Sequence, residues 1–284
     1  MDGPLVSVLM TAYNREKYIA EAIESVLAST YKNFELIIVD DRSSDNTLSI
    51  AKSYAAKDER IRVYCNEENL GDYPNRNKAA SYAKGKYLKY VDSDDKIYPH
   101  CLEVMVNSME QFPEATWGLV SAQSNYNFGK PFPFQLTPSE IFRYDGNGVR
   151  ILSRAPLSLI LKRECFEKEN GFLPVRQWGD AELSRRWAIQ YNLVIIEPDL
   201  VWYRTHDDQE NAINSKVKRY SIVASNRFIE LYNSSISKLD KETTEKLVRK
   251  QKKLRSSVIL KSLLSFQFKE AISLYKLVQQ NVQQ

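Results

Sequence analysis

Residues 34–41 read Phe34-Glu35-Leu36-Ile37-Ile38-Val39-Asp40-Asp41, an almost unbroken apolar run that ends abruptly in two carboxylates. Such a run is expected of a parallel strand covered by helices on both faces. A helical pattern follows it, with Ala51 and Tyr54 at apolar positions and Ser43 or Ser44 as the helix cap. This part of the chain therefore predicts a strand followed by a helix.

The same alternation extends on both sides. A strand is predicted at residues 5–10 and a helix at 19–27, and a third strand, a third helix and a fourth strand follow at 61–64, 74–83 and 87–91. Four strands alternating with three helices predict an α/β fold with a mostly parallel, twisted sheet and right-handed crossovers.

Polar side chains follow three of the predicted strands directly. They are Thr11-Ala12-Tyr13-Asn14, Asp40-Asp41 and Asp92-Ser93-Asp94-Asp95. Because ligands of such sheets bind at the carboxyl ends of the strands, we expect the three segments to gather at one edge. The last segment crowds three carboxylates that repel one another, and a hard divalent cation would neutralise them. Taken alone, it also fits a polar turn with a helix-capping aspartate.

The rest of the chain predicts a second half and a helical tail. Residues 117–201 are less regular, with a loop at 130–134 and strands at 157–161 and 194–196, and the pattern beyond 215 is helical except for a turn near 233–237. We therefore expect one domain over residues 1–214, with halves 1–98 and 99–214. A C-terminal helical region covers 215–284.

Charge is unevenly distributed in this chain of 284 residues, whose net charge is only +4. From Lys238 to the end there are eleven Lys or Arg and four Asp or Glu. A basic, amphipathic helical tail has three readings: peripheral contact with an anionic membrane, homo-oligomerisation, or packing on the parent domain. The mild overall charge gives no indication of nucleic-acid binding.

The cysteines Cys65, Cys101 and Cys165 are far apart and lack CxxC spacing, which argues against a disulfide framework or a zinc site and favours a reducing cytoplasm. The N-terminus lacks the charge pattern of a signal peptide, and no segment approaches the roughly 20 apolar residues of a membrane span. We expect a cytoplasmic protein, either free or peripheral at the inner face of the plasma membrane.

Four segments in order carry a family resemblance. They are Val6-Ser7-Val8-Leu9-Met10-Thr11-Ala12-Tyr13-Asn14, Ile38-Val39-Asp40-Asp41-Arg42-Ser43-Ser44-Asp45, Asn69-Leu70-Gly71 with Arg76-Asn77, and Tyr90-Val91-Asp92-Ser93-Asp94-Asp95. Together they resemble family 2 glycosyltransferases of the GT-A fold, closely over the first hundred residues and more loosely to about Asn211. The resemblance implies an inverting enzyme. It would move a hexose or N-acetylhexosamine from a UDP-sugar to a hydroxyl of a glycan, glycolipid or glycoprotein, with Mn²⁺ or Mg²⁺.

The resemblance also implies roles at the nucleotide. Tyr13 is expected to stack on the base with Thr11 nearby, and Asp41 to accept the imide hydrogen of uracil. Arg76 is expected near the base or the phosphates. The alternatives are a strand-end aromatic in the core for Tyr13 and an ordinary helix-surface position for Arg76. Asp40 is expected to cap the following helix if Asp41 reads the base.

The acidic segment resembles the family's Asp-x-Asp motif. The resemblance places Asp94 and Asp95 at the metal, with Asp94 the first choice, and Asp92 and Ser93 at the donor, although the individual roles of the acids stay open. His206, in Tyr203-Arg204-Thr205-His206, is expected to complete the metal shell or touch the diphosphate. A surface histidine or one satisfied in the core is the alternative.

An inverting transfer needs a base for the attacking hydroxyl. In Trp178-Gly179-Asp180-Ala181-Glu182 the resemblance makes Asp180 this base and Glu182 the reserve, whereas a helix N-cap is the structural reading of Asp180. Trp178 would offer an apolar platform for a sugar ring.

Two other classes stay open at this point. A sugar nucleotidyltransferase would need a Gly-rich phosphate loop after the first strand, and residues 11–14 contain no glycine. A non-catalytic partner of another transferase would have no need for the acidic segment or Asp180.

Overall fold

The first ninety residues form four strands and three helices, as the sequence predicts. In the computed structural model, which describes residues 3–121, 128–147, 149, 151–175, 178–206, 217–234, 239–265 and 267–280, these elements are β1 (Val6–Ala12), α1 (Ile19–Leu27), β2 (Phe34–Asp40), α2 (Thr47–Ala55), β3 (Ile61–Cys65), α3 (Asp72–Ser81) and β4 (Tyr87–Tyr90). β1 lies between β2 and β4 and is parallel to both, and β3 is parallel to β2. The predicted parallel arrangement of this half is confirmed.

The second half extends the same sheet with mixed strand directions. Its elements are β5 (Lys96–Ile97), α4 (Cys101–Gln111), β6 (Trp117–Val120), β7 (Phe134–Leu136), α5 (Pro138–Gly146), the 3-10 turn η1 (Pro156–Ser158), β8 (Leu159–Lys162), α6 (Arg163–Lys168), α7 (Gly179–Ala188), β9 (Leu193–Ile196) and β10 (Val201–Trp202). The strand order of the large sheet is β3-β2-β1-β4-β8-β6-β9-β7. β8 runs antiparallel to both β4 and β6, and β7 runs antiparallel to β9. Phe134 belongs to β7, so the loop expected over 130–134 ends one residue earlier.

Two apolar layers enclose the sheet, because successive side chains of a strand point to opposite faces. Val8 and Met10 of β1 pack in the layer that includes α1, α2 and α4, whereas Leu9 packs in the layer of α3 and α7. All three side chains are fully buried. Helices therefore hold the sheet from both faces, including the edge at which β1, β2 and β4 end.

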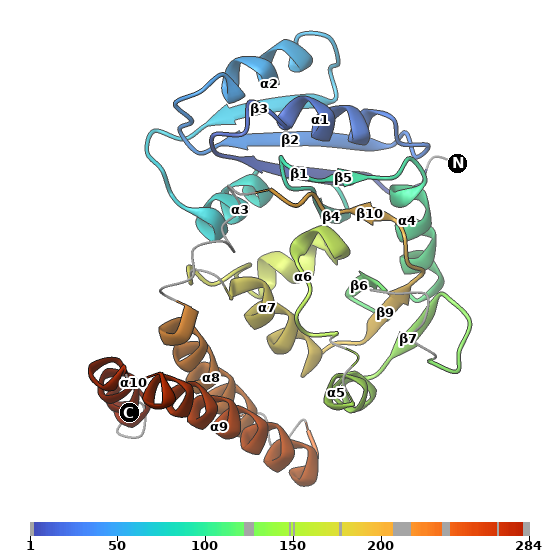
Figure 1. Cartoon of the computed structure of the whole chain (residues 1–284). Coiled ribbons are helices and arrows are strands. Elements are labelled where there is room, and N and C mark those ends of the chain that lie inside the picture. The colour runs from blue at the N-terminus through green and yellow to red at the C-terminus, as the bar shows by residue number, and fades with distance from the viewer. Residues whose placement is uncertain are drawn as a thin grey trace.

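The described part of the C-terminal region forms three helices below the domain: α8 (Val217–Ser234), α9 (Lys241–Leu264) and α10 (Phe268–Gln280) (Figure 1). Its helical character is confirmed. The end of α9 at Leu264 and the start of α10 at Phe268 were not predicted, since the apolar spacing continues from one helix to the other. The expected domain boundary at 214/215 and most of the expected turn at 233–237 lie outside the described residues. No helix in the described ranges combines the length and the apolar character that crossing a bilayer requires.

Candidate active site

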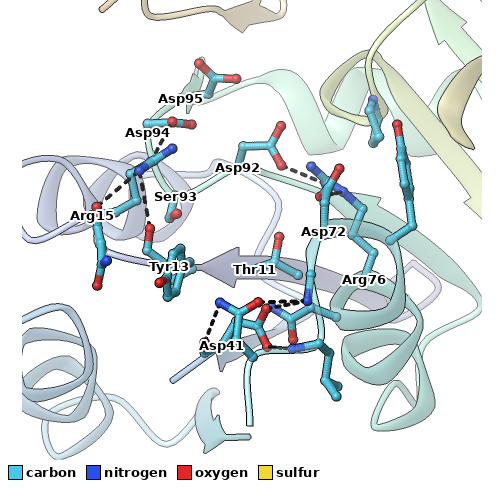
Figure 2. Close-up of a pocket in the computed structure, with 18 of the residues that line it drawn as sticks. Thr11, Tyr13, Arg15, Asp41, Asp72, Arg76, Asp92, Ser93, Asp94 and Asp95 are labelled. Atoms are coloured by element: carbon cyan, nitrogen blue, oxygen red, sulfur yellow. Dashed lines mark hydrogen bonds and ion pairs between the residues drawn. The ribbon is translucent and has the colours of Figure 1, made fainter. Parts of the chain in front are cut away.

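A cavity of about 1080 Å³ opens at the carboxyl ends of β1, β2 and β4 (Figure 2). Its walls come from the three polar segments after these strands, from α3 and from the first turn of α7. The expected site residues on its lining are Thr11, Tyr13, Asp41, Arg76, Asp92, Ser93, Asp94, Asp95 and Asp180. The predicted gathering of three strand ends at one edge is therefore confirmed.

The loop after β1 is fixed to the loop that precedes α2. The backbone N–H of Asn14 donates to Ser43 Oγ at 2.9 Å, and Ser44 N–H donates to Asn14 Oδ1 at 2.8 Å. The expectation that Ser43 or Ser44 caps α2 is wrong, because both serines bind Asn14 and the helix begins only at Thr47. Asp45 bonds the start of α2 instead: its Oδ1 accepts a hydrogen bond from Thr47 N–H at 2.9 Å.

This attachment presents two side chains to the cavity. Tyr13 is 48% exposed, which excludes the core position considered for it. Arg15 points from the same loop toward the acidic segment, and its Nε donates to Asp94 Oδ2 at 2.9 Å (Figure 2). The side chain of Arg15 therefore brings a positive charge to the acidic segment 92–95.

Asp41 closes the loop that leads into α3. Its Oδ1 accepts hydrogen bonds from Asn66 Nδ2 at 2.7 Å and from Leu70 N–H at 2.9 Å, and its Oδ2 accepts from Gly71 N–H at 2.9 Å. A carboxylate has about four acceptor positions, so Oδ2 can still take a further donor from a ligand. Asp40 Oδ1 accepts a hydrogen bond from Ser43 N–H at 2.9 Å, within the loop that precedes α2. Asp40 therefore does not cap α2.

Arg76 is buried between two carboxylates. Its Nε lies 2.7 Å from Asp72 Oδ1 and its Nη1 lies 2.7 Å from Asp92 Oδ1 (Figure 2). Burial alone would lower the pKa of Arg76, but Asp72 and Asp92 raise it well above its usual value. Since the arginine side chain is only 9% exposed, the helix-surface alternative is excluded. Arg76 fixes Asp92 and keeps a permanent positive charge at the wall of the cavity.

The segment around residue 204 crosses the acidic motif and is bonded to it. Arg204 N–H donates to Asp95 Oδ1 at 2.8 Å, and Arg204 Nε donates to the carbonyl of Asp94 at 2.9 Å. Burial, followed by the charge of Asp92, raises the pKa of Asp95 to about 7. These bonds place His206 Nε2 3.1 Å from Asp94 Oδ2. The structure thus brings the three expected metal ligands, Asp94, Asp95 and His206, together from segments far apart in the chain.

The donor set around Asp94 fits a divalent cation with few protein ligands. A carboxylate and an imidazole nitrogen are groups that could ligate such an ion, and Asp94 Oδ2 and His206 Nε2 lie 3.1 Å apart, with Arg15 Nε also 2.9 Å from Asp94 Oδ2. In the described ranges, no three His, Cys, Asp or Glu side chains form a complete metal cluster. An ion held by one or two protein groups and completed by substrate phosphates and water is the usual pattern for Mg²⁺.

Asp180 lies at the first turn of α7, where it lines the cavity and is partly buried. Its Oδ1 accepts the N–H of Ala181 at 2.7 Å. Burial raises the pKa of Asp180, while Ala181 N–H and the hydroxyl of Tyr73, which also bonds this carboxylate, limit the rise. The N-cap position belongs to Trp178, so Asp180 is not the N-cap residue.

Two neighbours of Asp180 have structural roles. Glu182, the expected reserve base, is fully buried, lies outside the cavity lining and pairs with Arg186 at 3.1 Å. Trp178 packs edge-on against Phe228 of α8 at 5.8 Å between ring centroids and is also absent from the lining. The structure therefore does not place its ring as a platform for a sugar.

Arg15, Tyr73 and Arg204 are among the residues at the site that were assigned no role from the sequence. Arg15 and Arg204 stand within two residues of expected site residues, which is the signal that could have indicated them. Tyr73 gave no such signal, because its contact with Asp180 joins residues more than a hundred positions apart.

Known proteins resemble this chain in sequence and in fold. The family model described as "Glycosyl transferase family 2" matches residues 7–156. Glycosyltransferase GlyG of Streptococcus pneumoniae is 30% identical over 213 residues, which cover 70% of this chain and 70% of GlyG. Matches of higher identity to other curated relatives span only about two fifths of those proteins.

Solved structures share the fold. TarS of S. aureus in complex with UDP-GlcNAc superposes with a TM-score of 0.65 at 20% identity, over 89% of this chain and 72% of that one. A mannosyltransferase from Pyrobaculum calidifontis in complex with GDP-Man and Mn²⁺ superposes with a TM-score of 0.58 at 14% identity, over 99% and 84%. These likenesses confirm the GT-A fold expected from the sequence.

Proposed function

Because this chain belongs to glycosyl transferase family 2 and is therefore a glycosyltransferase, we propose that its donor is a UDP-sugar and that it acts with inversion. The transferred group would be a hexose or an N-acetylhexosamine, and the acceptor a hydroxyl of a glycan, lipid-linked or glycoprotein acceptor. The UDP-GlcNAc bound to TarS, which has the same fold, supports a uridine nucleotide. We assign donor binding mainly to residues 1–98 and acceptor binding to 99–214.

One observation carries the proposal: Asp180 and the acidic segment 92–95 line the same cavity although they come from different halves of the domain. An inverting transfer needs a base on one side of the sugar and a stabilised leaving group on the other. Asp180 takes the proton of the acceptor hydroxyl while the new bond forms at the anomeric carbon. The bond to the diphosphate breaks in the same step, and its electron pair stays on the diphosphate oxygen.

The leaving diphosphate acquires negative charge, which this cavity is equipped to balance. Arg76 and Arg15 are positive side chains on its lining. Asp94, Asp95 and His206 would hold Mn²⁺ or Mg²⁺. Asp95 Oδ1 also accepts the N–H of Arg204, in the segment that carries His206. When bound, such an ion supplies Lewis-acid stabilisation of the phosphate oxygens.

The nucleoside would lie over the loop after β1. Tyr13 is exposed there and can stack on a base, with Thr11 beside it. Asp41 Oδ2 can accept the imide hydrogen of uracil while it still holds Gly71 N–H. Asp92 and Ser93 remain proposed donor contacts, since both line the cavity.

A screen of nucleotide sugars with Mn²⁺, read as released nucleoside diphosphate, tests the proposal. UDP-glucose, UDP-galactose, their N-acetylated forms and GDP-mannose form the panel. We expect hydrolysis of at least one UDP-sugar, abolished by chelator. A preference for GDP-mannose would overturn the nucleotide assignment, and inactivity with the whole panel would overturn the donor class.

Asp180→Asn tests the base separately. The variant should keep UDP affinity, while transfer falls by about 10²- to 10⁴-fold. Glu164→Gln, which alters an exposed acid of α6, is the matched control and should behave as wild type. Full turnover in Asp180→Asn would remove Asp180 from the mechanism without affecting the donor assignment.

A further inference from the structure

The C-terminal helices are attached firmly to the catalytic domain through α8. Phe228 packs against Trp178, and Tyr232 packs edge-on against Phe142 at 5.9 Å between ring centroids. α9 adds a contact between Lys250 Nζ and Asp145 Oδ2 at 3.6 Å. Since these contacts fix the helices to the domain, the surfaces that α9 and α10 turn to solvent have a defined orientation (Figure 1).

Exposed apolar side chains are concentrated around the turn between α9 and α10. Of the twelve large hydrophobic residues exposed in the described ranges, seven lie between Leu254 and Tyr275. We define the outer apolar face as five of these side chains, Leu260, Leu263, Leu264, Ile272 and Tyr275. Their exposed fractions are 54%, 39%, 71%, 57% and 55%. The three leucines follow i, i+3, i+4 spacing on α9, and Ile272 and Tyr275 follow i, i+3 spacing on α10, so each group shares one face of its helix. Large exposed apolar patches mark interaction sites.

The same helices are strongly basic. Residues 241–280 contain ten Lys or Arg and three Asp or Glu. The exposed Lys261 stands three positions before Leu264, and the exposed Lys269 and Lys276 stand three before and four after Ile272, spacings that make side chains neighbours on a helix. Apolar side chains bordered by lysines are the pattern of a helix that lies in the interface of an anionic bilayer.

We propose that the outer apolar face is a docking surface for an anionic lipid bilayer. Charge decides the occupant: a second copy of this chain would bring the same excess of positive charge to the contact, whereas an anionic bilayer attracts it. The apolar side chains enter the headgroup region and the lysines contact lipid phosphates. This inference concerns where the enzyme acts and does not depend on which sugar it transfers.

Vesicle co-sedimentation of the full chain tests the inference. We expect binding to vesicles of phosphatidylcholine with phosphatidylglycerol, at least about tenfold weaker binding to phosphatidylcholine alone, and a loss of binding as salt is raised. The double variant Leu264→Ser/Ile272→Ser should bind anionic vesicles at least about tenfold more weakly. Tyr98→Ser removes a similarly exposed apolar side chain elsewhere and should bind as wild type.

The double variant Lys269→Glu/Lys276→Glu tests how much the lysine charges contribute to vesicle binding, with Lys168→Glu on α6 as the control. Each charge lost should weaken binding to anionic vesicles about fivefold, and the control should not. Circular dichroism establishes that the variants are folded. Equal binding of wild type and the Leu264/Ile272 variant would overturn the proposal. A second outcome would also overturn it: sedimentation equilibrium shows that the wild type is a dimer, and the Leu264/Ile272 variant is a monomer that binds vesicles as the wild type does.

Discussion

The ring of Tyr73 lies directly against the backbone of Gly179. A Cβ atom at Gly179 would stand 2.8 Å from Tyr73 Cδ2 and Cε2, closer than real contacts allow. This contact brings α3 against the first turn of α7 and lets the Tyr73 hydroxyl bond the carboxylate of Asp180. The helix that carries Arg76 therefore also positions the proposed base.

Tyr73→Phe should shift the pH dependence of transfer. Asp180 acts as a base only when deprotonated, and the hydroxyl of Tyr73 lowers the pKa of Asp180, against burial, which raises it. Loss of this hydrogen bond raises the pKa further, so the acid limb of kcat/KM should move up by about 0.5 to 1 pH unit. Pre-steady-state or steady-state transfer assays across the acid range measure the shift.

Tyr144→Phe is the control for that variant. It removes a hydroxyl that donates to the Phe128 carbonyl at 3.1 Å, outside the cavity lining. Its acid limb should coincide with that of wild type. An unshifted limb in Tyr73→Phe would mean that Tyr73 has only a packing role at α7.

Gly179→Ala should destabilise the protein. The added methyl group meets the ring of a residue that is only 5% exposed, so the ring cannot move into solvent. Overpacking of this kind costs about 1 to 3 kcal/mol in the free energy of unfolding, measurable by urea denaturation. Gly146→Ala, where nothing lies within 4 Å of the added atom, should be neutral or slightly stabilising. Equal stabilities for the two variants would contradict the close packing.

Arg76→Gln should reduce both stability and donor affinity. The substitution leaves Asp92 beside the cavity without the positive charge of Arg76, so we expect a loss of about 2 to 3 kcal/mol in the free energy of unfolding. Arg60→Gln breaks a partly exposed pair with Asp58 and should cost less than about 1 kcal/mol. Urea denaturation and UDP titration of both variants provide the comparison. A purely structural Arg76 would lower stability but leave UDP affinity unchanged.

The parallel half of the fold was predictable because its information is local. The apolar run of β2 and the spacing of α1 determine strand and helix without reference to distant residues. The second half was not, since the antiparallel insertion of β8 between β4 and β6 depends on pairing between segments far apart in sequence. The start of α2 was missed for the same reason: Ser43 and Ser44 bond Asn14, about thirty positions earlier.

At the site, the sequence indicated which residues gather but not how their atoms are used. Asp41 was expected to bind the nucleotide base, and nothing in the neighbouring sequence indicated the hydrogen bonds that it accepts from Leu70 and Gly71. Glu182 resembled a second candidate base until its burial and its pairing with Arg186 became visible. Burial and long-range hydrogen bonds decide such roles, and neither can be read from spacing along the chain.

The pairing of Asp94 with His206 predicts how cation and nucleotide binding are linked. Asp94→Asn and His206→Gln each remove one proposed ligand, so each should reduce the gain in UDP affinity produced by Mn²⁺ by at least about tenfold. UDP affinity measured with chelator should change less. Isothermal titration of UDP with and without Mn²⁺ gives both quantities and does not depend on activity.

The chain offers matched controls for both substitutions. His100→Gln changes the other histidine, which is exposed and outside the cavity, and Asp58→Asn changes an acid paired with Arg60 at the surface. Both controls should keep the full response to Mn²⁺. If Asp94→Asn loses the response and His206→Gln keeps it, the acid ligates the cation alone and His206 serves only to hold Asp94. If both variants keep it, the cation is not held by this pair.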